Sequence, residues 1–344
     1  MKKIETITAP LKAGTDFLIK HRHPEPQAAA QFLLSAIMGI SRTETTMVKS
    51  MSAIQAKNFK LNLKELALKR KPLAYVLGSA DFMGIRLDTP AHKVLIPRPE
   101  TELLVEEVIR QYAPMLPCSC APVNINCSPV RLCSCAPVNK GIPLSNNSTV
   151  TQQHSNTPAA RQVQRHILRI LDIGTGSGNI AISLYKNLCD RFNLAITATD
   201  ISDKALKVAG DNLKSASIPK NAVTFLKGSL FTPLPESARF DVIVSNPPYV
   251  SHKQYCDLQP EIRLWEPKEA LIANKNGLEV IGDIIRQSPR YLRENGFIAL
   301  EISATQGDEV RKMLVDHGYK RIEIKRDFNN YDRIATAIWT VKRR

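Results

Sequence analysis

The segment Ser245-Asn246-Pro247-Pro248-Tyr249 follows the apolar run Phe240–Val244 and carries the residue types most specific for chemistry in this chain. Asn246 supplies a side-chain oxygen, and prolines lack backbone donors, so the segment can present several acceptors to a planar NH2 group. Hydrogen bonds accepted from both N–H groups of the substrate would raise the electron density on its nitrogen and orient that nitrogen toward a sulfonium methyl. The ring of Tyr249 could stack on the plane of the NH2 group. No metal or charged base is required, because the proton can leave after the methyl has moved. The segment predicts methylation of an amide or amino nitrogen, with Asn246, Pro247 and Tyr249 as catalytic residues, and the alternative is a turn without chemical importance.

A glycine-rich turn lies between a predicted strand and the apolar helix Ile180–Leu188, in the order Gly174-Thr175-Gly176-Ser177-Gly178. Glycines allow close approach of the backbone to a ligand. The spacing is Gly-x-Gly-x-Gly and not the Gly-x-Gly-x-x-Gly that seats a pyrophosphate, which favours a methionine-type cofactor over a nicotinamide. A turn that serves packing alone is the alternative.

Asp200 ends the next predicted strand, at the separation from the glycine turn at which an acid accepts hydrogen bonds from ribose hydroxyls. This position predicts that Asp200 binds the cofactor. The alternative is a helix N-cap, for which Ser202 and Asp203 are equally plausible.

Two kinds of element precede this region. Apolar residues recur at three- and four-residue spacing from Leu11 to Val76, which predicts a small helical unit. Residues 81–96 predict two short strands around Asp88-Thr89-Pro90, and a helix follows at 101–112.

From Ile167 onward, apolar runs alternate with amphipathic stretches, which indicates a doubly wound α/β sheet whose ligands lie beyond the carboxyl ends of the strands. The predicted strands are Ile167–Ile173, Leu194–Thr199, Val223–Leu226, Phe240–Ser245, Gly296–Ile302, Arg321–Ile324 and Ala335–Val341.

Residues 113–166 differ in composition, since they contain neither Asp nor Glu and repeat the string Cys-Ser-Cys-Ala-Pro-Val-Asn at 118–124 and 133–139. They lack the apolar pattern of a core, so we expect a low-complexity, disordered insertion. Zinc binding through Cys118, Cys120, Cys133 and Cys135 is the alternative, although structural zinc sites usually space paired cysteines further apart. We expect no metal site.

The whole chain has 344 residues, a net charge of +15 and seven cysteines. A basic chain favours polyanionic partners, yet the surplus can equally lie on solvated faces. The N-terminus does not resemble a signal peptide, and the longest apolar stretch, Ala28–Ile40, is too short to cross a bilayer. These features predict a cytoplasmic protein without membrane association.

Further phrases in the chain match one known family. With the Asn-Pro-Pro-Tyr segment and the glycine turn, the chain resembles the peptide chain release factor glutamine N-methyltransferases, the HemK/PrmC family, over nearly everything outside the insertion. The additional matching phrases are Ile96-Pro97-Arg98-Pro99-Glu100-Thr101-Glu102, Pro72-Leu73-Ala74-Tyr75 with Gly78 and Phe82-Met83-Gly84, and Trp265-Glu266-Pro267 with Ala270-Leu271. Glu100 and Glu266 either shape the pocket or brace loops.

The resemblance implies a Rossmann-like class I methyltransferase fold with a small N-terminal helical domain. The implied division is a helical substrate-binding domain at 1–80, a hairpin and linker helix at 81–112, the insertion, and an S-adenosylmethionine-dependent methyltransferase domain at 167–344.

The implied reaction is methyl transfer to the side-chain amide of the glutamine in the Gly-Gly-Gln motif of class I release factors, by a monomer that does not require nucleic acid. The glycine turn and Asp200 would hold S-adenosylmethionine, with Leu230 near its adenine. Asn246 would touch both cofactor and glutamine, and Pro247, Pro248 and Tyr249 would line the glutamine pocket. Ser229 and Leu230 depart from the family, where an acid and a larger aromatic are frequent, so the adenine would be held differently.

Three rival functions remain at this point. A nucleic-acid amino methyltransferase of the adenine-N6 type would use the same grip but needs a unit for flipping and recognising the base. A non-catalytic translation-associated binding protein could keep the fold, although the intact glycines and Asn246 speak against it. A nicotinamide dehydrogenase would be distinguished by binding NAD.

Overall fold

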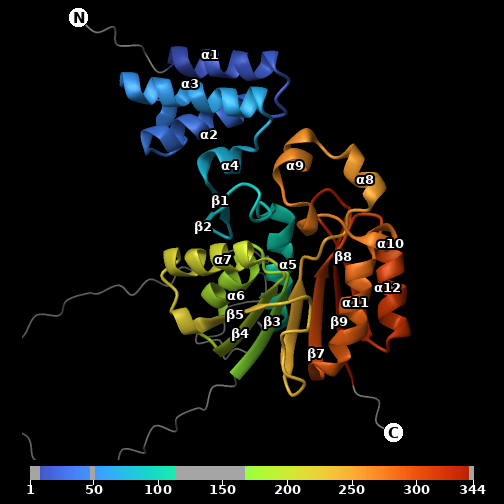
Figure 1. Ribbon diagram of the computed structural model, residues 1–344. Coiled ribbons are helices and arrows are strands. Elements are labelled where there is room, and N and C mark those ends of the chain that lie inside the picture. Colours follow the sequence, from blue (N-terminus) through green and yellow to red (C-terminus); the bar gives the residue numbers. More distant parts are fainter. Residues whose placement is uncertain (1–7, 47–50, 113–166, 341–344) are drawn as a thin grey trace, which may run out of the picture. The chain divides into compact units, whose positions relative to one another are not determined.

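The computed structural model describes residues 8–46, 51–112 and 167–340 (Figure 1). The predicted insertion at 113–166, with the cysteines considered for zinc, lies outside the described residues. The described residues on either side of it belong to one compact unit.

The N-terminal part is helical, as predicted. Its apolar core contains Leu18, Leu33, Phe59 and Leu63, which are at most 5% exposed. Ser52 accepts a hydrogen bond from the backbone N–H of Gln55, and the Gln55 side chain accepts one from the backbone N–H of Ser52 in return, which fixes the start of the longest of these helices. The helices are α1 (Thr8–Lys20), α2 (Pro26–Met38), α3 (Ala53–Leu68) and α4 (Leu73–Leu77).

The hairpin that follows differs from the prediction. Its strands are β1 (Ser79–Phe82) and β2 (Ile85–Asp88), joined by Met83 and Gly84, whose φ angles of 51° and 73° are those of a tight hairpin turn. The predicted turn at residues 88–90 and the predicted second strand at 94–96 are wrong. Val94 instead packs against Ala205 and Val208, and its backbone oxygen accepts a hydrogen bond from the Tyr75 hydroxyl.

The main sheet has seven strands in the order β5-β4-β3-β6-β7-β9-β8, and β9 is antiparallel to both of its neighbours. The strand order reverses between β3 and β6, which is the topological switch point of a doubly wound sheet. All seven predicted strands are present, and the predicted Rossmann-like class I methyltransferase fold is confirmed. The strands are β3 (Ile167–Ile173), β4 (Asn193–Asp200), β5 (Val223–Lys227), β6 (Phe240–Ser245), β7 (Leu292–Glu301), β8 (Lys320–Arg326) and β9 (Asp332–Ile338).

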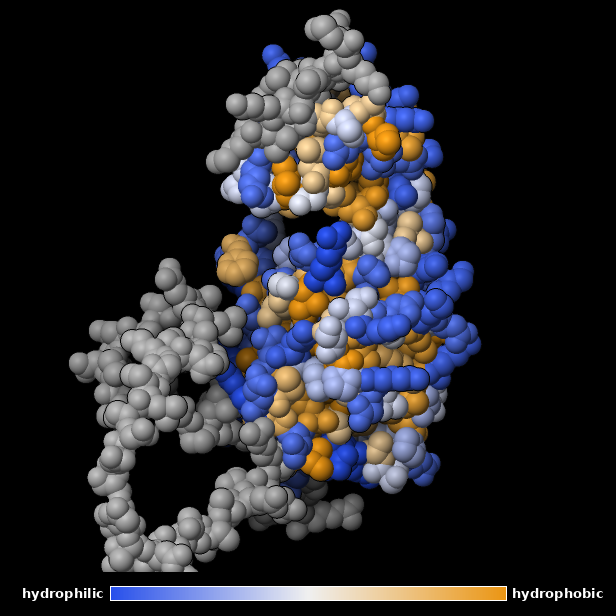
Figure 2. Space-filling view, turned by 90° about the vertical axis from the view of Figure 1, so that its left-hand side faces the viewer, coloured by the Kyte–Doolittle hydropathy of each residue, from blue (hydrophilic) through white to orange (hydrophobic). Residues whose placement is uncertain are grey.

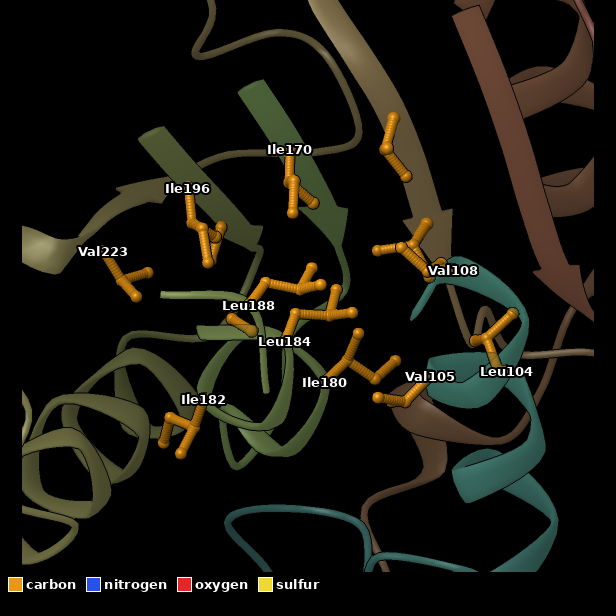
Figure 3. Packing of buried hydrophobic residues seen from close by; sticks show 14 of the residues in the cluster. Leu104, Val105, Val108, Ile170, Ile180, Ile182, Leu184, Leu188, Ile196 and Val223 are labelled. Carbon is orange, nitrogen blue, oxygen red and sulfur yellow. The ribbon is translucent and has the colours of Figure 1, made fainter. Parts of the chain in front are cut away.

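Helices cover both faces of this sheet (Figure 1). Ile170 packs toward α5 and α6, whereas its neighbour Leu171 packs toward α11 and α12, because successive strand residues point to opposite faces. Figure 3 shows the first of these layers, in which Leu104 and Val108 of α5 lie beside α6. The helices are α5 (Pro99–Tyr112), α6 (Asn179–Leu188), α7 (Asp203–Ser215), α8 (His252–Asp257), α9 (Pro260–Trp265), α10 (Asn274–Gly277), α11 (Glu279–Gln287) and α12 (Gly307–Asp316).

One face of the surface is seen in Figure 2, where hydrophilic residues predominate and hydrophobic residues show between them. Helix α7 illustrates the pattern, because it buries Ala205, Val208 and Leu213 while exposing Lys204 and Lys207. In the described part of the chain, no helix has the length and apolar character needed to cross a membrane.

Candidate active site

A cavity of about 370 Å³ opens where β3, β4, β5 and β6 end. This is the carboxyl edge of the sheet on both sides of the switch point, where the sequence predicted the ligand. Gly174, Gly176, Asp200, Leu230 and Asn246 all line it. The structure therefore brings together predicted residues that follow four separate strands.

Two glycines of the turn face open space. Gly174 and Gly176 have φ angles of 71° and 56°, and, apart from the glycine and its two chain neighbours, no described residue has an atom within 4 Å of the position that a Cβ would take at either glycine. A side chain in this left-handed region is strained, and it would also take up space at the cavity wall. The two glycines thus form a cradle into which a ligand can approach the backbone closely.

The other predicted residues of the turn serve its shape. At Gly178 the φ angle is 81° and a Cβ would lie 3.1 Å from Cβ of Ala209 in α7, so this glycine permits close packing of two helices. The hydroxyl of Thr175 donates to Oδ2 of the buried Asp172 at 2.6 Å, and Ser177 is 2% exposed. Within the described lining of the cavity, none of these three predicted cofactor residues takes part.

Asp200 is held by two backbone N–H groups. Its Oδ2 accepts from Gly176 and its Oδ1 from Ser202, both at 2.9 Å. Ser202 itself accepts from the backbone N–H of Ala205 and begins α7, so the N-cap is Ser202 and not Asp200. Burial raises the pKa of Asp200, although these N–H groups oppose the shift. A carboxylate has about four lone-pair sites, so Asp200 retains acceptor capacity for a donor from the cavity.

A second, smaller cavity of about 150 Å³ adjoins the first. Asn246 and Pro247 line both cavities, whereas Pro248 is found in the wall of the larger and Tyr249 in the wall of the smaller. Pro248 therefore lies beside the larger cavity, and its expected place in the glutamine pocket stays a prediction. The other lining residues of the smaller cavity are Leu95, Arg98, Val250, Leu258, Ile262, Ala270 and Leu271.

A chain of hydrogen bonds runs behind the smaller cavity. Nδ2 of Asn246 donates to the Thr101 hydroxyl at 3.0 Å, and that hydroxyl donates to Oε2 of Glu301 at 2.6 Å. The Tyr249 hydroxyl donates to Oε1 of Glu301 at 3.1 Å. Burial raises the pKa of Glu301 and also that of Tyr249, so the phenol keeps the proton that it donates.

Comparison with known proteins decides the family. Residues 10–78 match the PrmC N-terminal domain and residues 159–262 match the methyltransferase small domain. The release factor glutamine methyltransferase of Thermodesulfovibrio yellowstonii is 32% identical over 89% of this chain and 90% of its own length. That of Rhodopirellula baltica is 30% identical over 96% of this chain and 95% of its own length. The chain belongs to the release factor glutamine methyltransferase family.

A solved structure of this family covers 72% of the chain. It is the release factor-specific protein-(glutamine-N5) methyltransferase of Alicyclobacillus acidocaldarius, with 21% identity, 95% of its own chain covered and a TM-score of 0.37.

In the present chain, Arg98 lines the smaller cavity and forms an ion pair with Glu266, which is 4% exposed. Burial raises the pKa of Glu266, and the guanidinium of Arg98 opposes that shift. Of the two roles considered for Glu266, the structure favours that of shaping the pocket, because its carboxylate holds Arg98 at the cavity wall. Glu102, in the same matching phrase as Arg98, accepts a hydrogen bond from the backbone N–H of Met83 at 2.7 Å and so holds the hairpin in place.

Sequence reasoning gave no role to three residues of this site. Thr101 was noted only as part of a matching phrase. Glu301 has a visible signal, since it is a charged residue within the apolar run Gly296–Ile302. Gly277 has φ of 85°, and a Cβ there would lie 2.0 Å from the backbone oxygen of Tyr249. No local pattern could have revealed that contact, because it joins two distant segments of the chain.

Proposed function

We propose that this chain transfers a methyl group from S-adenosylmethionine to the side-chain amide nitrogen of the glutamine in the Gly-Gly-Gln motif of class I peptide chain release factors. The observation that carries the proposal is the pair of adjoining cavities that share Asn246 and Pro247. One cavity is large enough for a nucleoside-type donor and the other for a single side chain. Family membership and the names of the relatives support the choice of substrate.

The residues of the larger cavity suit this donor, which when bound supplies an electrophilic methyl on a sulfonium sulfur. Gly174 and Gly176 leave open space along the backbone for it. Asp200 has lone pairs for the ribose hydroxyls, and Leu230 offers an apolar wall for the adenine. Thr175, Ser177 and Gly178 contribute indirectly, since they hold the turn in shape.

In the smaller cavity, the chain's own groups would orient the amide. Oδ1 of Asn246 and a backbone oxygen at Pro247 accept the two N–H groups, and the ring of Tyr249 packs on the amide plane. An amide nitrogen is a poor nucleophile because its lone pair is delocalised, and hydrogen bonds to both N–H groups return electron density to it. Preorganised acceptors of this kind act without reorganising during the reaction.

We further propose that the chain acts as a monomer in the cytoplasm, where translation terminates. The substrate is itself a large protein, so one copy of this chain can supply the whole site. Nucleic acid is not required, and the net positive charge of the chain can attract an acidic protein surface over a long range.

The test is mass spectrometry of a purified class I release factor after incubation with the chain and S-adenosylmethionine. We expect one added methyl, on the Gly-Gly-Gln glutamine, with the wild type and with Asn187→Ala, but not with Asn246→Ala. Asn187 is a matched control because, among the described residues, its side chain bonds only to the backbone oxygen of Ser183, one turn earlier in the same helix. Label in a nucleic-acid substrate with an unmodified factor would overturn the proposal in favour of an amino methyltransferase of nucleic acid.

A further inference from the structure

Glu301 is a buried carboxylate at the carboxyl edge of the sheet. It ends β7, beside the end of β6 from which Asn246 follows, and it is 1% exposed. Both of its oxygens are engaged, one by Thr101 and one by Tyr249. A buried charge is a poor source of stability, since apolar residues of similar volume often do as well. Folding stability therefore does not explain why a glutamate occupies this position.

The proton of the Thr101 hydroxyl determines how Asn246 is oriented. A hydroxyl carries one proton, and Thr101 donates it to Glu301 at 2.6 Å. Toward Asn246 the same oxygen can then only accept, so the amide must present Nδ2 to it, as observed at 3.0 Å. Oδ1 is thereby left without a donor among the described residues, on a side chain that lines both cavities.

The opposite orientation would disable the site. If the Asn246 amide turned over, its NH2 group would face the NH2 group of the substrate, and two donors cannot bond to each other. Asparagine has no intrinsic preference between the two orientations, because its oxygen and nitrogen differ little in size. The choice must come from a neighbour whose donor and acceptor roles are fixed.

We propose that Glu301 is a positioning residue for methyl transfer, which fixes the amide of Asn246 through Thr101 and holds the ring of Tyr249 through its hydroxyl. One buried carboxylate thus orients both side chains that contact the amide in the proposed function, on which this inference rests. Burial raises the pKa of Glu301, and the hydrogen bonds from Thr101 and Tyr249 together with the guanidinium of Arg333 oppose that shift. Arg333 is itself paired with Asp327 at 3.1 Å.

Three variants separate positioning from folding. Glu301→Gln keeps the shape but can donate to Thr101, which lets the hydroxyl donate to Asn246 and reverses the amide. Thr101→Val removes the hydroxyl at nearly constant volume, whereas Thr101→Ser retains it. We expect the first two to lower kcat for the release factor by about 100-fold and Thr101→Ser to stay within about threefold of the wild type. KM and the affinity for S-adenosylmethionine should change by less than about threefold in all three.

A second readout needs no substrate. In ¹⁵N-labelled protein, the Asn246 side-chain NH2 should exchange slowly with solvent in the wild type and in Thr101→Ser, because it is donated to a buried hydroxyl. That protection should be lost in Thr101→Val and in Glu301→Gln. If the wild type leaves the release factor unmethylated while this pattern holds, the substrate assignment fails and the positioning role stands.

Two results would overturn the positioning role. One is wild-type kcat in both Glu301→Gln and Thr101→Val. The other is a loss of kcat that is accompanied by an equal loss of cofactor affinity and a lower melting temperature, which is the signature of a residue needed only for folding.

Discussion

Replacing Gly277 by alanine would press a side chain against the segment that walls the smaller cavity. The new Cβ would lie 2.0 Å from the backbone oxygen of Tyr249 and 2.8 Å from its carbonyl carbon, at a φ of 85°. No rotamer change relieves a clash with backbone, so the Tyr249 carbonyl must move by about 1 Å, and a misplacement of that size can lower kcat by about 100-fold. The strained φ and the overpacking together should lower the free energy of unfolding by about 2–5 kcal/mol.

Gly282→Ala is the matched control, five positions further along. Gly282 lies inside α11, and a Cβ there would be 3.6 Å from Sδ of Met313, an ordinary contact. Alanine in a helix interior stabilises by about 0.5–1 kcal/mol relative to glycine, so we expect a slightly higher melting temperature and unchanged kcat. Thermal unfolding and methyl-transfer kinetics measure both effects. Wild-type kcat in Gly277→Ala, with the protein folded, would refute the link between this contact and the site.

Three further outcomes are expected. Gly178→Ala should lower the free energy of unfolding by about 2–5 kcal/mol without changing the cofactor affinity measured by calorimetry. Gly174→Ala should lower the free energy of unfolding by about 1–2 kcal/mol and should also weaken cofactor binding. Equal cofactor affinities in the two variants would contradict the assignment of Gly178 to packing and Gly174 to the cofactor. Asp200→Ala should raise the Kd for S-adenosylmethionine by at least about tenfold, as expected for lost hydrogen bonds to a charged group, and an unchanged Kd would exclude its role. Burial raises the pKa of Asp172 from 3.8 to about 7, so the folded state holds this proton more tightly and the associated stability is lost as the pH rises between those values. Asp172→Asn should therefore flatten the fall in melting temperature between about pH 5 and 7, and an undiminished slope would show that another group titrates.

The sheet was predictable because its central strands are buried on both faces. Ile167–Ile173 and Phe240–Ser245 are mainly apolar, and Arg169, Asp172 and Asp241 are their charged residues; the predicted bounds of both strands are those observed. The position of the hairpin was not predictable, because the apolar residues at 94–96 are packed without forming a strand. Gly84 was the informative residue there, since a two-residue turn requires the positive φ that it adopts.

The site was predictable where chemistry is local in sequence. Asn246 and Asp200 each follow a strand, and parallel strands bring their carboxyl ends to one edge. The residues that hold the site come from elsewhere, since Thr101 is 145 residues from Asn246 and 200 residues from Glu301. Strand order and helix placement determine such contacts, and a single sequence does not contain them in readable form.

The shared wall between the cavities also decides which variants are informative. Asn246 lines both cavities, so its replacement disturbs donor and amide together and cannot tell binding from orientation. Thr101, Glu301 and Gly277 line neither of the two, yet each contacts a residue that does. These three residues contact cavity-lining residues without lining a cavity themselves. A loss of kcat on their replacement, with the affinity for the methyl donor retained, would therefore report a changed orientation of the lining residues alone. We therefore expect the sharpest separation of kcat from binding at residues that never touch a ligand.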